Sequence, residues 1–139
     1  MAWVVDTCLL LDIGLDDPAF GAKSEALLRE KSADGLTVSP VTFVELAPAF
    51  GGELGALRKF LGALDIASDE SWETTDTEHA GRAWAKHILG RRAAKQRHPK
   101  RPVADVLIGA FALRFSGLLT RNTADFRALY PKLRLVSPA

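Results

Sequence analysis

The chain of 139 residues contains little cysteine and histidine, and it has no long apolar run. Its single cysteine, Cys8, cannot form an internal disulfide, which favours a reducing compartment. The three histidines, His79, His87 and His98, have no spacing typical of a zinc site, either with one another or with Cys8. No apolar run approaches the ~20 residues that cross a bilayer, and no basic segment precedes Trp3-Val4-Val5. We therefore expect a cytoplasmic protein with no membrane association.

Two common enzyme motifs are also missing. The chain has no G-x-x-x-x-G-K-[ST] loop, which argues against a nucleotidase of the P-loop kind. Asp6 follows an apolar segment, as a phosphatase nucleophile would. An enzyme resembling the haloacid dehalogenases, however, would need a second aspartate two residues later, where Cys8 stands.

The net charge of +1 conceals an uneven distribution. Residues 1–70 carry five Lys/Arg and twelve Asp/Glu, a balance of −7, whereas residues 71–139 carry thirteen and five, a balance of +8. Such asymmetry is typical of a chain whose basic half meets an anionic partner. The alternative is two solvated faces that neutralise each other.

Short apolar segments alternate with segments of helical periodicity along the whole chain. We predict strands at Ala2–Asp6, Leu36–Val38, Asp65–Ala67, Gly117–Thr120 and Leu133–Val136. We predict helices at Thr7–Ile13, Ala19–Lys31, from Pro40 onward with Ser39 as N-cap, and at Glu53–Leu64, Thr74–Arg92, Pro102–Phe115 and Thr123–Leu129. This alternation predicts one domain over residues 1–139, an α/β/α sandwich of three layers around a central, mostly parallel sheet.

Four acidic residues occupy positions that such a sheet would bring together. Asp6 ends the first strand, Glu45 lies in the helix after the second, Asp105 lies in the first turns of its helix, and Asp125 follows the fourth strand. Ligands bind beyond the carboxyl ends of parallel strands, so all four acids can reach one edge. Each also has a simpler explanation, because Asp6 and Asp125 can cap helices, Glu45 can be solvated, and Asp105 can favour a helix dipole.

A cluster of carboxylates needs a cation. Two unit charges ~4 Å apart repel by about 4 kcal/mol at an effective dielectric of ~20, and a divalent ion removes that repulsion. Oxygen-only ligands suit Mg²⁺ or Mn²⁺ rather than Zn²⁺. The neighbours of Asp105 fit a closely packed helix, because Gly109, Ala112 and Ser116 follow it on one line and allow close approach to the sheet.

Four segments of the sequence together resemble the PIN-domain family, and most closely its small toxins of the VapBC type. They are V-V-D-T-C-L-L-L-D at Val4–Asp12, S-P-V-T-F-V-E-L at Ser39–Leu46, V-A-D-V-L-I-G-A-F-A-L at Val103–Leu113 and T-R-N-T-A-D-F at Thr120–Phe126. Their order and spacing span nearly the whole chain. One departure is Pro48, which should end or kink the helix that carries Glu45.

The resemblance implies a Mg²⁺-dependent endoribonuclease, the toxin of a toxin–antitoxin pair, with RNA as substrate and a small antitoxin as partner. Separately, apolar side chains of the helices at 19–31 and 53–64 can form a homodimer, which we expect, or an antitoxin groove, or they can be ordinary core. By position, Asp6 and Asp105 match the firmest metal ligands, and Glu45 and Asp125 match acids that act directly or through water. The remaining matches support the site: Thr7, Thr120 and Asn122. The alternative is a PIN-fold module that binds RNA or protein and has lost its activity.

A basic run precedes Asp105 and contains no acid. It consists of Arg91, Arg92, Lys95, Arg97, Lys100 and Arg101. Such a run can follow an RNA backbone through phosphate contacts, or it can be a solvated loop or a surface for an acidic partner. Trp3, Trp72 and Trp84 can stack bases, although Trp3 and Trp84 fit core packing better.

Overall fold

The structure is a computed structural model that describes residues 1–93 and 103–139, with side chains for residues 1–90 and 103–139. The basic run therefore lies outside the described side chains. The described residues form a sheet of five parallel strands in the order β3-β2-β1-β4-β5. The strands are β1 (Trp3–Val5), β2 (Leu36–Thr37), β3 (Ile66–Ala67), β4 (Gly117–Leu119) and β5 (Leu135–Val136).

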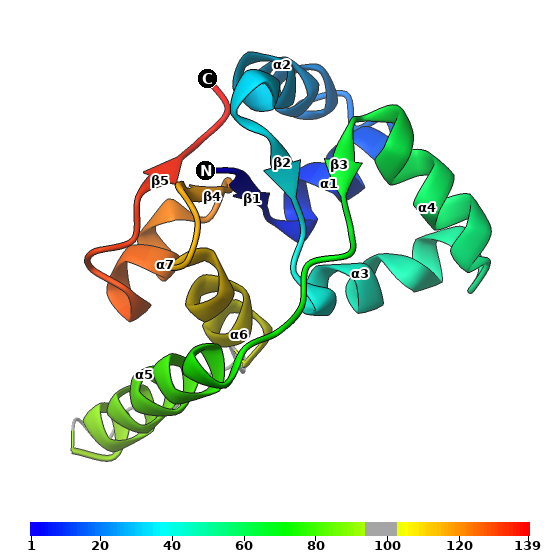
Figure 1. Cartoon of the computed structure of the whole chain (residues 1–139). Coiled ribbons are helices and arrows are strands. Elements are labelled where there is room, and N and C mark those ends of the chain that lie inside the picture. The colour runs from blue at the N-terminus through cyan, green and yellow to red at the C-terminus, as the bar shows by residue number, and fades with distance from the viewer. Residues whose placement is uncertain (94–102) are drawn as a thin grey trace.

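Helices cover both faces of this sheet, which confirms the predicted three-layer α/β/α architecture (Figure 1). One face carries α1 (Thr7–Gly14), α2 (Gly21–Lys31), α3 (Pro40–Leu46) and α4 (Leu54–Ala63). The other carries α5 (Thr74–Ala93), α6 (Val103–Ala112) and α7 (Thr123–Leu129). Two short 3-10 helices, η1 (Ser32–Asp34) and η2 (Ala47–Phe50), extend α2 and α3.

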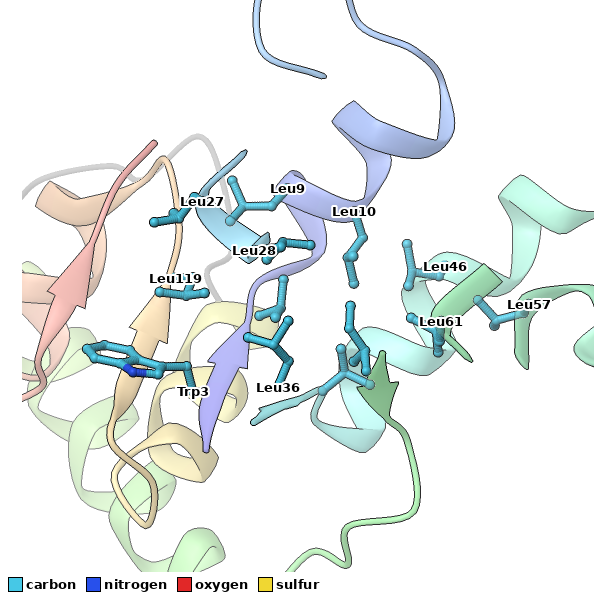
Figure 2. Close-up of a cluster of buried hydrophobic side chains, with 13 residues drawn as sticks. Trp3, Leu9, Leu10, Leu27, Leu28, Leu36, Leu46, Leu57, Leu61 and Leu119 are labelled. Atoms are coloured by element: carbon cyan, nitrogen blue, oxygen red, sulfur yellow. The ribbon is translucent and has the colours of Figure 1, made fainter. Parts of the chain in front are cut away.

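The central strand divides the core in two because successive side chains of a strand point to opposite faces. Trp3 and Val5 pack with the leucines of α1 to α4, the cluster drawn in Figure 2. Val4 packs instead with Phe111 and Phe126 from α6 and α7. All of these side chains are almost fully buried. Two separate apolar clusters therefore hold the helix layers on the sheet and fix the register of β1.

The chain reverses its direction of travel across the sheet at β1. β2 and β3 lie on one side of β1, and the chain then returns to form β4 and β5 on the other. Val5 pairs with Leu119, so β1 and β4 end side by side. The backbone N–H of Asp6 donates to the Leu119 carbonyl at 2.9 Å. Ligands of parallel sheets bind at such a point, where neighbouring strands diverge into different helices.

The end of α6 departs most from the prediction, whereas α3 ends as predicted. α6 ends at Ala112 rather than Phe115, because Arg114 and Phe115 bond to carbonyls three residues earlier and the N–H of Ser116 bonds to the Ala2 carbonyl. The start predicted at Pro102 lies outside the described residues. α3 ends at Leu46 and continues as a 3-10 turn through Pro48, as the proline predicted.

Within residues 1–93 and 103–139, no helix combines the length and apolar character that crossing a bilayer requires.

Candidate active site

Asp6 stands at the carboxyl end of β1 and is 3% exposed. One carboxylate oxygen, Oδ1, caps α1 by accepting the Thr7 N–H at 2.8 Å. The other, Oδ2, accepts the Thr120 hydroxyl at 2.7 Å and lies 3.3 Å from Cys8 Sγ. Burial raises the pKa of Asp6, and these hydrogen bonds oppose that rise. Asp6 therefore both caps its helix and links the end of β1 to Thr120, which follows β4.

Glu45 reaches the same region from α3. Ser39 caps that helix by accepting the Thr42 N–H at 3.1 Å, and Pro40 occupies its first turn, as the sequence predicted. Glu45 lies on the exposed side of α3. The Thr7 hydroxyl donates to Glu45 Oε1 at 2.6 Å, and the Thr7 and Thr42 hydroxyl oxygens are 3.0 Å apart. Thr7 follows Asp6 directly in the chain, and its hydroxyl thus links the end of β1 to the Glu45 carboxylate.

Asp105 provides the electrostatic evidence that the acids share one region. It lies in the first turn of α6 and is half-buried. Its pKa is raised to about 6, first by burial and then by the negative charges of Asp6, Asp125 and Glu45. A neighbouring carboxylate has this effect only where the two charges are near each other. Asp6, Asp125 and Glu45 therefore lie near enough to Asp105 to repel its negative charge.

Asp125 and Asn122 come from the segment after β4. Asn122 precedes α7 without a side-chain cap, and its backbone N–H donates to Thr120 Oγ1 at 3.0 Å. Asp125 is exposed in the first turn of α7. Thr120 is fully buried and so joins this loop to Asp6 through its hydroxyl. Thr7 and Thr120 both contact predicted acids, whereas Asn122 acts here through its backbone.

The donor chemistry fits a hard divalent cation, because the converging groups are carboxylate and hydroxyl oxygens. The side-chain positions are less compact than a closed metal site. Among the described residues, no three Asp, Glu, His or Cys side chains lie close enough together to hold one ion. A bound cation would therefore draw Asp105, Glu45 or Asp125 toward Asp6, and it would relieve the repulsion that raises the pKa of Asp105.

Sequence reasoning missed a salt bridge beside this site. Arg121, between Thr120 and Asn122, pairs with the buried Asp12 of α1: its Nε is 2.7 Å from Oδ2, and its Nη2 is 3.0 Å from Oδ1. Both residues lie in segments that carry the family resemblance. The available signal was that an apolar helix face contained a carboxylate, which needs a cation when it is buried.

The tryptophans lie apart from the acids. Trp3 is buried in the core, as predicted. Trp72 and Trp84 line an apolar cavity of about 390 Å³ between α5 and α6, whose walls include none of the four acids. Trp72 also stacks on Phe111 with a centroid distance of 6.3 Å. Neither Trp72 nor Trp84 is therefore placed to stack a base beside Asp6.

Gly109 holds α7 against α6 and so sets where Asp125 stands. A Cβ at this position would lie 2.4 Å from the Tyr130 ring and 3.3 Å from that of Phe126. The Tyr130 hydroxyl donates to the Val106 carbonyl in the same helix. The sequence predicts that the small residues of this helix bring α6 close to the sheet. At Gly109 the space instead receives two rings from α7 and the residue after it.

Replacing Gly109 with alanine should destabilise the protein by about 1–3 kcal/mol, because the new methyl group overpacks the core and displaces Tyr130. Urea denaturation measures this change. Gly62→Ala is the matched control: its Cβ would meet nothing within 4 Å, and alanine favours a helix. Equal stability of Gly109→Ala and the wild type would show that Tyr130 moves without cost.

Comparisons with known proteins bear on the fold alone. No known family profile matches the sequence, and neither does any curated protein. Among solved structures, VapBC2 from Rickettsia felis bound to a DNA fragment from their promoter matches with a TM-score of 0.65 and 15% identity, over 99% of this chain and 98% of that one. FitAB bound to an IR36 DNA fragment matches with a TM-score of 0.58 and 17% identity, over 97% and 94%. The chain therefore has the same fold as these two solved structures, and this is the three-layer α/β fold that its sequence predicted.

Proposed function

We propose that this chain is a metal-dependent endoribonuclease that uses Mg²⁺ or Mn²⁺. The observation that carries the proposal is the electrostatic coupling of four carboxylates from four separate segments, in which Asp6, Asp125 and Glu45 all raise the pKa of Asp105. Clustering like charges destabilises a fold, so a site of this kind implies a cation that compensates for it.

Asp6 and Asp105 would bind the cation directly, and Glu45 and Asp125 would bind it directly or through water. When bound, the cation would neutralise the phosphate charge and activate a water molecule. Attack of that water on phosphorus and cleavage of the bond to O3′ would leave a 5′-phosphate and a 3′-hydroxyl. Thr120 would orient Asp6, and Thr7 would orient Glu45, through the hydrogen bonds they donate.

The substrate and partners follow from the resemblance and from charge. Residues 71–139 carry a balance of +8, which suits the backbone of RNA. The basic run Arg91–Arg101, which precedes Asp105 in the chain, would contact the phosphates of an RNA bound at Asp105. The two similar solved structures described above, VapBC2 and FitAB, are complexes bound to DNA. We propose that this chain acts in the cytoplasm as the toxin of a toxin–antitoxin pair and is inhibited by a small antitoxin. We also propose that it forms a homodimer.

One observation favours a second candidate, a PIN-fold binding module without activity. In the part of the chain that the structure describes, the acids do not form a ready-made group of three ligands. Titration with Mn²⁺ separates the two functions. A nuclease should bind the ion in the micromolar to millimolar range, whereas an inactive module should bind it no better than an Asp6→Asn variant.

Digestion of defined single-stranded RNAs tests the proposal. We expect cleavage with Mg²⁺ or Mn²⁺, products with a 5′-phosphate, and no cleavage in EDTA. If the cleavage products are the same with and without EDTA, the activity would belong to a contaminating nuclease that does not require a metal. Absence of cleavage of every RNA, together with full Mn²⁺ binding, would contradict the ribonuclease assignment and leave the metal site standing.

A further inference from the structure

Arg121 makes an unusually complete set of contacts for a residue in a short loop. Its guanidinium binds both carboxylate oxygens of Asp12, at 2.7 and 3.0 Å. It also lies over the Phe20 ring, 4.2 Å from the centroid. Asp12 is buried and receives a further hydrogen bond of 3.3 Å from the Ser24 hydroxyl. The planar fork of arginine suits such bidentate pairing, and lysine cannot reproduce it.

The two segments joined by this pair are the same two that form the Asp6–Thr120 contact. Thr120, next to Arg121 in the chain, donates to Asp6 Oδ2 at 2.7 Å. Asp6 caps the helix α1 that carries Asp12. The loop after β4 is thus attached to α1 twice, once at the acidic site and once about one and a half turns along the helix. The second attachment restricts how the loop can rotate about the first.

We propose that Arg121 is a positioning residue of the acidic site, which acts through Asp12 to hold the loop after β4 so that Thr120 stays on Asp6 and the start of α7, with Asp125, keeps its place. This inference rests on the proposed function for its catalytic consequence. Its structural part concerns the loop alone. Arg121 is not required to touch RNA or metal in this role.

A second arginine–aspartate pair offers a matched control. Arg114 binds both oxygens of the fully buried Asp76 at 2.9 Å and lies over the rings of Phe111 and Phe115. Its bidentate pairing with a buried aspartate therefore resembles that of Arg121, although Arg114 also donates to the Ser71 carbonyl at 2.8 Å and lies 3.4 Å from Glu73 Oε2. It joins the start of α5 to the turn after α6, however, and touches neither the loop after β4 nor α1. Loss of either pair costs stability, but only one should alter the acidic site.

The experiment compares Arg121→Gln, Arg121→Lys, Asp12→Asn and Arg114→Gln in the full chain. Hydrogen exchange should accelerate at least tenfold at the Thr7 and Asn122 amides when the Arg121 pair is broken, because these amides donate to Asp6 Oδ1 and Thr120 Oγ1. Arg114→Gln should leave the relative protection of those two amides unchanged. Arg121→Lys keeps the charge and should give an intermediate result, and it decides the outcome if Arg121→Gln fails to fold.

Mn²⁺ titration and the kinetics of RNA cleavage measure how breaking the Arg121–Asp12 pair affects the acidic site. Arg121→Gln should weaken Mn²⁺ binding about tenfold and lower kcat with little change in KM, whereas Arg114→Gln should change neither. Asp12→Asn should reproduce the Arg121→Gln effect, and the double variant should add nothing, since both changes break one contact. Additive effects, or a rise in KM with a changed salt dependence, would overturn the proposal in favour of a direct RNA contact.

The two ideas can fail separately. If the wild type neither binds Mn²⁺ nor cleaves RNA, the proposed function is wrong, and hydrogen exchange still decides whether Arg121 positions the loop. If the wild type is active and Arg121→Gln behaves like Arg114→Gln in every measurement, the pair is only structural and the inference is wrong.

Discussion

Asp6→Asn should reduce metal-dependent RNA cleavage by about 10²–10³-fold while leaving the protein folded. Asn keeps an oxygen that can accept the Thr7 N–H and an amide that can meet the Thr120 hydroxyl. It removes the charge that a cation needs, and loss of one such electrostatic group typically costs this much. Because burial raises the pKa of Asp6, removing its charge should not lower stability at neutral pH.

The measurement is the initial rate of cleavage of one defined RNA at saturating Mn²⁺. Asp69→Asn, a change of the same kind in an exposed residue between β3 and α5, should retain full activity. Circular dichroism and the thermal midpoint verify folding of both variants. Activity of Asp6→Asn within a few-fold of the wild type would remove Asp6 from the site.

Asp105→Asn should stabilise the protein without metal, and it should lose that advantage over the wild type when metal is added. Its pKa in the folded protein is about 6, against an ordinary value of 3.8, so the folded state binds this proton more tightly than the unfolded chain does. Stability therefore falls as pH rises from about 4 to about 6, and the full penalty is present at pH 8. Asn removes that penalty, which is about 1 kcal/mol once screening of this half-buried group is allowed for.

Thermal unfolding in EDTA and in millimolar Mn²⁺ measures whether Asp105→Asn stabilises the protein without metal and destabilises it, relative to the wild type, with metal. In EDTA at pH 8 the variant should melt above the wild type, and the gap should close as pH falls below 4. Mn²⁺ should raise the melting temperature of the wild type by mass action and have much less effect on the variant, whose affinity should fall more than tenfold. Equal responses to Mn²⁺ would show that Asp105 does not hold the ion.

Local rules of the chain accounted for most of the fold. Ser39 and Pro40 started α3, and Pro48 ended it, because capping and the missing proline N–H act within one turn. The end of α6 was predicted three residues late, because its termination depends on Ser116 pairing with Ala2 in a distant segment. Sequence periodicity does not report such a contact.

The sequence indicated the four candidate acids and, by resemblance, the supporting residues Thr7 and Thr120, but it did not reveal the Arg121–Asp12 pair. Asp6 and Asp105 were found because strand ends and helix starts are visible in sequence, and Glu45 and Asp125 were added by resemblance. The Arg121–Asp12 pair joins residues 109 positions apart, so no local pattern reveals it. The close approach of Tyr130 to Gly109 was also hidden, because it depends on how α7 lies on α6.

The strand order has a consequence for synthesis of the chain. β1 leaves the ribosome early, yet one of its edges pairs with β4, with Val5 opposite Leu119. At ribosomal speeds this partner arrives on the order of ten seconds later. Until then, Asp6 lacks the Thr120 hydroxyl and the acids of α6 and α7 are not yet made. On the proposed function, a nascent chain would thus be unable to cleave RNA until the segments that carry Asp105, Thr120 and Asp125 have emerged and β4 has paired with β1.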